Sequence, residues 1–402
     1  MVFHWTRLRG KPLRQVVVAL ALIAAGAATS HAQRTVVSPS VAPSAAPSAG
    51  ALRAAVERGL TSAPLGFEAL QSPSQTGVRV LDLRVEQLGP ATRITIDLSQ
   101  KTLTYDPTGD VEAVVDAVIA STAPLTSGAV EYRFLVEGLP LDEFLPRAGP
   151  SQPARTLADP GAHRVVISAG HGVYWNEGFG DWRLQRPRLW GIVEDLVNWD
   201  ITNYLAAQLA GSPFQAVLVR QPDRDDRPGV SGRPAWQEAA LYFMKTAAVP
   251  PDVWNIGVDD YARDINTRPF YANWVDAVAV ISIHNNGGEA TGTETWFDAT
   301  NGHEAASQRL AEIVNRRVVS AIRAEYNPEW VDRGLRSCNG CKGENRLASR
   351  PAIILEIAFM DRRTPDNEAL QDERFKQIVA RAIRDALHEW AGAAAAPRSR
   401  TD

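Results

Sequence analysis

The stretch RVVISAGHG, residues 164–172, decides the fold class of this 402-residue chain. Its apolar, β-branched run is typical of a strand buried on both faces, and His171 follows the carboxyl end of that strand. Similar strand-like runs recur at residues 214–220, 277–284, 293–298 and 352–359, and helical patterns alternate with them at residues 193–209, 258–274, 304–325 and 372–390. This alternation predicts an α/β domain over residues 160–392, with a mostly parallel sheet and helices on both faces.

A segment of different pattern precedes this region. Residues 78–88 and 91–100 alternate apolar and polar side chains around Gly89-Pro90, as two antiparallel strands do. A helical pattern at residues 110–121 and a strand-like run at residues 130–138 follow. We expect a small α+β module over residues 76–148. It has no cluster of His, Cys or paired carboxylates, which favours a binding or spacer role. Through TIDLSQ and FLVEGLPLDEFLP it resembles the GerMN-type modules of exported envelope proteins, with an AMIN-type wall-targeting module as the alternative.

The two ends of the chain have the composition of non-globular segments. Residues 1–32 place Arg and Lys before ten apolar residues (16–25) and a small-residue stretch ending at Ala32, which predicts a secretory signal peptide. We therefore expect export to the periplasm or cell wall with no membrane anchor after cleavage; a retained anchor is the alternative. Residues 33–75, rich in Ser, Ala and Pro, predict a linker with a short helix near residues 51–58, and residues 393–402 a disordered tail.

Charge and cysteine content exclude some classes of partner and site. The formal net charge is -4, and it would be -8 without the basic signal peptide. Nucleic acid is a poor partner for such a chain, because Lys and Arg supply most nucleic-acid affinity. In an oxidising compartment we expect Cys338 and Cys341 to form a local disulfide rather than free thiols. A zinc knuckle would need two further ligands, and none is close in sequence.

Two histidines share one context at the carboxyl ends of predicted strands. His171 ends RVVISAG, and His284 ends VAVISI. A catalytic zinc ion takes three protein ligands from His and carboxylate and keeps one position open, and Glu194 at the start of a predicted helix supplies a carboxylate. The alternatives are structural, hydrogen-bonded histidines and an acidic residue that stabilises the first helical turn. His303 begins the run HEAAS but lacks the second His of the HExxH zinc motif, so we assign it to a helix start.

Glu356 is the most unusual carboxylate of the sequence. It lies within PAIILEIAF, and ionised carboxylates are rarely placed in a buried strand without a partner or a role. Near a metal it would serve as general base and then as general acid. An ion pair with Arg268 or Arg333 is the alternative.

Four blocks of the chain together resemble the zinc-dependent N-acetylmuramoyl-L-alanine amidases of the Amidase_3 family. In the order of that family they are VVISAGHG, the helix with EDLVNWDI, TRPFYANWVDAVAVISIHNNGG followed by GTETWF, and RPAIILEIAFMDRRTPDNEAL. The resemblance implies one Zn²⁺ per chain bound by His171, Glu194 and His284, with Glu356 as the catalytic glutamate. It implies peptidoglycan as substrate, cleaved at the amide between N-acetylmuramic acid and L-Ala of the stem peptide. The chain departs from the pattern by a long aromatic loop between His171 and Glu194, and by a second insertion at residues 222–255.

Two other functions stay open. A zinc peptidase acting on stem peptides would share the metal chemistry, and a non-catalytic wall-binding or regulatory protein would share the fold. The intact Glu356 argues against the second. The sequence does not identify a protein activator. Because the segment at residues 285–292 is too short for the long inhibitory helix of some members, we expect basal activity without one.

Overall fold

The computed structural model describes residues 47–61, 77–103, 110–146 and 163–395. The predicted signal peptide, much of the predicted linker and the tail beyond residue 395 lie outside the described residues. None of the described helices combines the length and apolar composition that a bilayer crossing needs.

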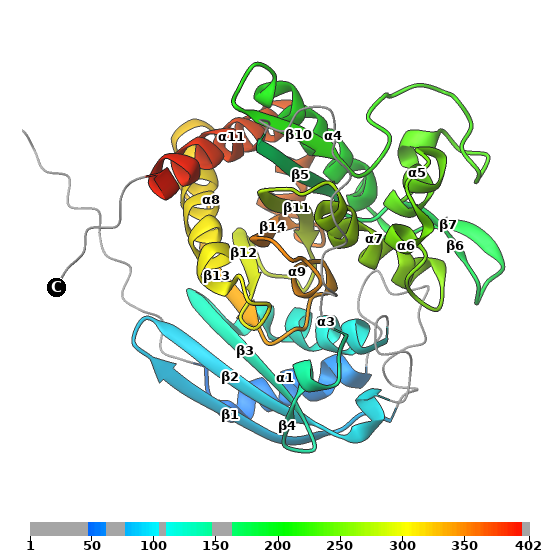
Figure 1. Cartoon of the computed structure of the whole chain (residues 1–402). Helices are drawn as coiled ribbons and strands as arrows, with labels where there is room; N and C mark the ends of the chain where they lie inside the picture. Colours follow the sequence, from blue (N-terminus) through cyan, green and yellow to red (C-terminus); the bar gives the residue numbers. More distant parts are fainter. Residues whose placement is uncertain (1–46, 62–76, 104–109, 147–162, 396–402) are drawn as a thin grey trace, which may run out of the picture. The chain divides into compact units, whose positions relative to one another are not determined.

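One large sheet organises the described chain. Its strands are β1 (Val80–Leu88), β2 (Ala91–Leu98), β3 (Ala129–Val136), β4 (Leu139–Pro140), β5 (His163–Ala169), β10 (Phe214–Leu218), β11 (Ala279–Asn286), β12 (Thr293–Asp298), β13 (Asp332–Cys338) and β14 (Ala352–Phe359). Their order is β1-β2-β3-β13-β12-β14-β11-β5-β10, with β4 beside β3 (Figure 1). Neighbours are parallel except at β1/β2, β12/β14 and β3/β4. The predicted fold class is therefore confirmed.

Helices cover both faces of this sheet. Helices α4 (Glu194–Leu209), α8 (Glu304–Glu325) and α11 (Glu373–Ala395) share one core with Val165 and Ile167 of β5. Helices α5 (Ala240–Thr246) and α7 (Asp260–Trp274) share another with Val166, on the opposite face of the same strand. Because successive side chains of a strand point to opposite faces, a strand covered on both sides must be apolar throughout. This explains the run that decided the fold class.

Short elements complete the chain. They are the hairpins β6 (Val173–Asn176) with β7 (Asp181–Leu184) and β8 (Arg188–Leu189) with β9 (Ile192–Val193), the helices α1 (Ala49–Thr61), α3 (Asp110–Thr122), α6 (Pro251–Trp254), α9 (Gly343–Arg346) and α10 (Glu368–Gln371), the 3-10 turns Gln100–Leu103, Ala123–Leu125, Leu141–Glu143 and Ala235–Gln237, and the π turn Arg363–Asn367. Both hairpins lie in the aromatic loop that separates His171 from Glu194.

The N-terminal segment joins the same sheet edge to edge. Strand β3 pairs in parallel with β13, from Val130 opposite Arg336 to Tyr132 opposite Cys338. Tyr132 also stacks on Trp296 of β12, with ring centroids 5.7 Å apart, and both side chains are buried. The predicted boundary between residues 76–148 and residues 160–392 therefore divides strands of one continuous sheet. That the two parts are separate domains stays a prediction.

Helix α1 lies in the segment that the sequence analysis assigned to a linker. The helix expected near residues 51–58 is present and longer. Its apolar side chains repeat at helical spacing, so that Leu52, Val56 and Leu60 are buried in the core that also contains α3. The structure thus places residues 49–61 in a packed core and not in a linker.

Cys338 and Cys341 form the expected disulfide. It links the last residue of β13 to the segment just before α9, which contains Glu344 of the site described below. Strand β13 itself was not predicted. Its pattern is obscured by Arg333 and Arg336, which are buried because both pair with Glu294 of β12.

Asn339 continues the pairing between β3 and β13 beyond the last paired residues through its side chain. Its side-chain Oδ1 accepts a hydrogen bond from Phe134 N, and its Nδ2 donates to Phe134 O, both at 2.9 Å and buried. Asn339→Ala leaves both backbone groups unsatisfied, so we expect the free energy of unfolding to fall by about 1–3 kcal/mol. Chemical denaturation measures it. Gln308→Ala, which removes an exposed bond to Glu312, is the control and should cost only about 0.2–0.5 kcal/mol. Equal losses of unfolding free energy in the two variants would show that Asn339 does not stabilise the β3/β13 pairing.

Candidate metal centre and active site

Three side chains from separate elements meet at the carboxyl ends of β5 and β11. His171 follows β5, Glu194 is the first residue of α4, and His284 lies near the end of β11. Nε2 of His171 lies 3.1 Å from Oε1 of Glu194, and Nδ1 of His284 lies 3.1 Å from Nε2 of His171 and 3.4 Å from the same Oε1. All three side chains are buried. The structure therefore brings together the three residues that the sequence nominated as ligands.

The backbone conformation around His171 allows the His171 and His284 side chains to lie close together. His171 has a φ of 64°, in the left-handed region that non-glycine residues rarely occupy and that clusters at functional sites. A Cβ at Gly170 would lie 2.3 Å from Cε1 of His284, so only glycine fits there. Glu194 is held on the other side, because Asn285 N donates to its Oε1 at 2.9 Å.

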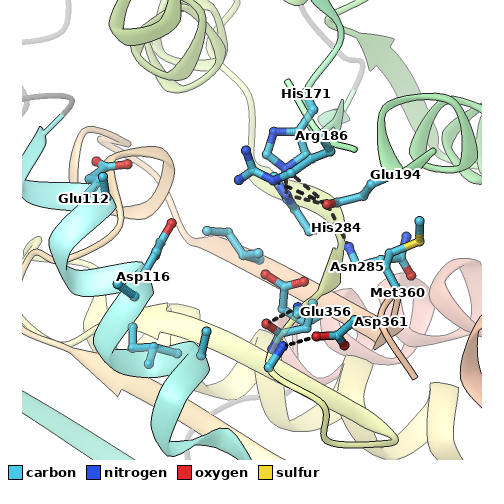
Figure 2. A pocket seen from close by; sticks show the side chains of 18 of the residues that line it. Glu112, Asp116, His171, Arg186, Glu194, His284, Asn285, Glu356, Met360 and Asp361 are labelled. Carbon is cyan, nitrogen blue, oxygen red and sulfur yellow. Dashed lines mark hydrogen bonds and ion pairs between the residues drawn. The ribbon is translucent and has the colours of Figure 1, made fainter. Parts of the chain in front are cut away.

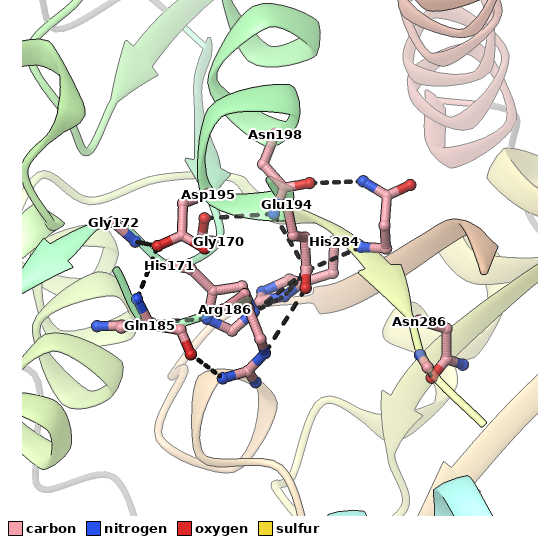
Figure 3. A network of polar contacts seen from close by, with 12 residues as sticks. Gly170, His171, Gly172, Gln185, Arg186, Glu194, Asp195, Asn198, His284 and Asn286 are labelled. Carbon is pink, nitrogen blue, oxygen red and sulfur yellow. Dashed lines mark hydrogen bonds and ion pairs between the residues drawn. The ribbon is translucent and has the colours of Figure 1, made fainter. Parts of the chain in front are cut away.

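A second layer of polar groups orients both imidazole rings, and Figure 3 shows Gln185 beside His171. Gln185 Nε2 donates to the Asp264 carboxylate at 3.0 Å, so its Oε1 faces His171 and accepts from Nδ1, also at 3.0 Å. On the other ring, Nε2 of His284 lies 2.9 Å from the Glu344 carboxylate, which can only accept. Both outer ring nitrogens therefore carry hydrogen. Nε2 of His171 and Nδ1 of His284 are the inner ring nitrogens, and both face Glu194.

Arg268 connects the two carboxylates of this second layer, Asp264 and Glu344. It pairs with Asp264 within α7, and its Nη1 lies 2.6 Å from Oε1 of Glu344. Arg333 pairs instead with Glu294. Both arginines are therefore committed to other carboxylates, and the alternative that either one pairs with Glu356 is wrong.

Burial and neighbouring charges set the protonation of the three candidate ligands. Burial lowers the pKa of His171 to about 3. Burial acts in the same direction on His284, but the carboxylates of Glu344 and Glu194 outweigh it and raise its pKa to about 10. Burial opposes ionisation of Glu194, yet His171, His284 and Arg186 hold its pKa well below the usual range. The site thus combines a neutral His171, a stabilised Glu194 carboxylate and a His284 that must release its Nδ1 proton when a metal binds.

This donor set fits a metal ion. The candidate ligand atoms all lie within 4.8 Å of one another. Two nitrogens and one carboxylate oxygen, each held by a second hydrogen-bonded group, are the ligands of a catalytic zinc site with one open position. Ligand atoms at about 2.1 Å from one zinc ion would be roughly 3.4 Å apart, close to the observed separations. His171, Glu194 and His284 could therefore hold a divalent metal.

Glu356 lies beside the cluster on the adjacent strand. It is directly opposite His284 in the parallel β11/β14 pair, so the two side chains leave the same face of the sheet. Its Oε2 is buried and has no hydrogen-bond partner among the described residues. Burial raises the pKa of Glu356 to about 8, and a nearby cation would favour the ionised form. Such a carboxylate is suited to accept and return a proton.

A cavity of about 580 Å³ contains this chemistry (Figure 2). His171, Glu194, His284 and Glu356 line one side of it. Helix α3 of the N-terminal segment lines the other, with Glu112 and Asp116. The helix is fixed there, because Asp116 pairs with Lys342 and a Cβ at Gly288 would lie only 2.4 Å from Ala120 O. The N-terminal segment is therefore part of the wall of the candidate active site.

Several residues of this site were not found from sequence. Gln185 and Arg186 lie in the aromatic loop, and Arg186 reaches to 3.6 Å of Glu194. Glu344 lies just after the disulfide, and Asp116 lies on a helix without a chemical motif.

Comparison with known proteins identifies the class of this site. The family model for N-acetylmuramoyl-L-alanine amidases, Amidase_3, matches residues 165–389, more than half of the chain. The chain belongs to this family of cell-wall amide hydrolases. No curated protein sequence matches it.

Solved amidase structures are similar at a distance. AmiC2 of Nostoc punctiforme is 23% identical, and the match covers 57% of this chain and 97% of AmiC2 with a TM-score of 0.38. Ami1 from Mycobacterium smegmatis is 17% identical, and the match covers 58% of this chain and 100% of Ami1 with a TM-score of 0.40. The catalytic domain of CwlV from Bacillus (Paenibacillus) polymyxa is 20% identical (57% and 98%, TM-score 0.38). These similarities carry no argument about substrate or metal.

Proposed function

We propose that this protein is an exported, zinc-dependent amidase that cleaves the bond between the lactyl group of N-acetylmuramic acid and L-Ala of the peptidoglycan stem. The observation that carries the proposal is the buried His171–Glu194–His284 cluster beside Glu356, whose buried Oε2 has no hydrogen-bond partner among the described residues, in a chain of the Amidase_3 family. The predicted signal peptide supports export, although it lies outside the described residues.

The residues divide the work of amide hydrolysis as follows. A zinc ion held by His171, Glu194 and His284 would polarise the scissile carbonyl and activate a water molecule. Glu356 accepts the proton that this water loses as its oxygen attacks the carbonyl carbon. When the C–N bond breaks, Glu356 returns the proton to the nitrogen of L-Ala. The products are the lactyl carboxylate of the glycan and a free stem peptide.

Product analysis tests this function. We would incubate the zinc-loaded full chain with purified peptidoglycan and identify the new chain ends by mass spectrometry. We expect intact glycan strands with free lactyl carboxyl groups and peptides that begin with L-Ala. Cleavage between amino acids would establish a stem peptidase instead. No hydrolysis by zinc-loaded protein, with peptidoglycan still bound, would favour the wall-binding alternative.

A further inference from the structure

A second hollow adjoins the catalytic cavity. It has a volume of about 470 Å³ and is lined by Trp190, Glu289, Asp361 and residues 362–364. Glu289 and Asp361 also line the cavity that contains Glu356. A substrate whose scissile bond lies at His171, Glu194 and His284 can therefore extend directly into this hollow.

Trp190 differs from the other aromatic side chains of its loop. Tyr174 is buried, Trp175 packs on Trp182 with centroids 5.7 Å apart, and Trp182 packs on Tyr242 at 4.9 Å. Trp190 is 46% exposed, and it has no aromatic or cation–π contact in the described part of the chain. Phe179 is more exposed, but the Arg183 guanidinium lies 3.8 Å from its ring centroid. Trp190 is thus the aromatic side chain of this loop that lines the hollow without a ring or cation contact among the described residues.

The backbone at Trp190 is one that tryptophan seldom occupies. Trp190 and Gly191 form the two-residue turn between β8 and β9, and their φ values are 42° and 98°. A turn with positive φ at both positions favours Asn, Asp or Gly at the first. A bulky aromatic residue is disfavoured there, so the turn itself does not explain its presence.

The turn is nevertheless held firmly. Gln371 Nε2 donates to Trp190 O at 3.2 Å, and Asn367 Nδ2 donates to Leu189 O at 3.3 Å. Arg188 Nη1 also donates to Gly191 O at 2.7 Å. The indole is therefore presented by a fixed backbone, as a preorganised contact surface requires.

The chemistry of the hollow suits a sugar ring. The face of an indole carries negative potential, which attracts the partly positive C–H groups of a pyranose face. Asp361 lies at the boundary of the two hollows; its Oδ2 accepts from Gly288 N at 2.7 Å and Glu289 N at 2.9 Å, whereas Oδ1 has no partner among the described residues. Oδ1 is itself buried, so the recognition rests on the indole, whose exposed face fits the C–H face of a pyranose ring.

We propose that Trp190 is a specificity-determining residue that packs against a sugar ring of the glycan, with the stem peptide on the opposite side, toward α3. This rests on the proposed function, because it assumes a substrate in which glycan and peptide meet at the scissile bond. The open hollow binds the glycan side, and the cavity bordered by Asp116 and Lys342 binds the charged and amide-rich peptide side.

Trp190→Asn is the sharpest variant, because Asn favours the same turn while it removes the indole. We expect its melting temperature to equal or exceed that of the wild type. Its Kd for a peptide-free GlcNAc–MurNAc oligosaccharide, measured by calorimetric titration, should rise by at least about tenfold. On a disaccharide muropeptide, KM should rise while kcat and zinc content stay unchanged. Trp190→Tyr should restore much of the binding.

The control and the opposing outcomes separate this inference from the proposed function. Trp175→Ala removes a half-exposed indole that does not line the hollow, and it should bind the oligosaccharide as the wild type does. An unchanged Kd and KM in Trp190→Asn would overturn the inference even if the wild type cleaves muropeptides. If the wild type cleaves nothing but binds the glycan through Trp190, the amidase proposal fails and the glycan site stands.

Discussion

Glu356→Gln is expected to lower turnover on muropeptides by roughly 10²- to 10⁴-fold, the usual contribution of general acid–base catalysis. The amide keeps the shape of the carboxylate but cannot take a proton from water. Zinc content should stay at about one ion per chain, because His171, Glu194 and His284 still supply their ligand atoms. Release of stem peptides measures turnover, and elemental analysis measures zinc in the same preparation.

The stability of this variant should stay level or rise. Glu356 Oε2 is buried without a hydrogen-bond partner in the described chain, and its raised pKa reflects the cost of burying its charge. A neutral amide relieves that cost, so we expect an unchanged or higher melting temperature. Near-normal turnover would remove Glu356 from the mechanism, and loss of zinc would make it a ligand and reopen the role of Glu194.

Glu294→Gln is the matched control for Glu356→Gln. Glu294 lies directly opposite Glu356 on the antiparallel neighbour β12 and is also buried. It pairs with Arg333 at 2.7 Å and with Arg336 at 3.3 Å, so its loss leaves buried positive charge uncompensated. We expect the free energy of unfolding to fall by about 3–5 kcal/mol. Below its melting temperature the Glu294 variant should keep its zinc and turnover, the opposite result to Glu356→Gln.

The predicted strands with the clearest sequence pattern are those buried on both faces. Residues 164–169, 277–284 and 352–359 are mostly apolar, because helices cover both sides of the sheet there. Strand β13 was missed because its buried arginines look like surface residues until Glu294, 39 residues from Arg333 in sequence, neutralises them. The edge pairing of β3 with β13 depends on tertiary packing, and no local pattern encodes it.

The candidate site follows a similar division. His171 and His284 were found because each follows an apolar strand, and parallel strands end at one edge of a sheet. The groups that orient them were missed, since Gln185 and Glu344 have no spacing that links them to the histidines in sequence. The wall formed by α3 could not be expected from a segment assigned to a separate module.

His284 has two contacts that a substitution would remove. Its Nδ1 faces the candidate metal position, and its Nε2 lies 2.9 Å from Glu344. Removing the side chain therefore deletes a ligand and also leaves buried Glu344 with one partner fewer. A loss of stability in His284→Ala alone would not distinguish these effects. The comparison of zinc-loaded and chelated protein does, because only a metal that binds the folded state adds stability by linkage.

His284→Ala is expected to contain little zinc and to show no measurable hydrolysis, because two protein ligands hold zinc far less tightly than three. In the wild type, chelation should lower the melting temperature, since a ligand at about 100 times its Kd adds roughly 2.7 kcal/mol to the stability of the folded state. In His284→Ala the loaded and chelated proteins should melt together, at a temperature below both wild-type values. His303→Ala, at the start of α8 and outside the cluster, should retain zinc, hydrolysis and the full chelation shift. Stoichiometric zinc in His284→Ala, or a chelation shift of wild-type size, would remove His284 from the metal site.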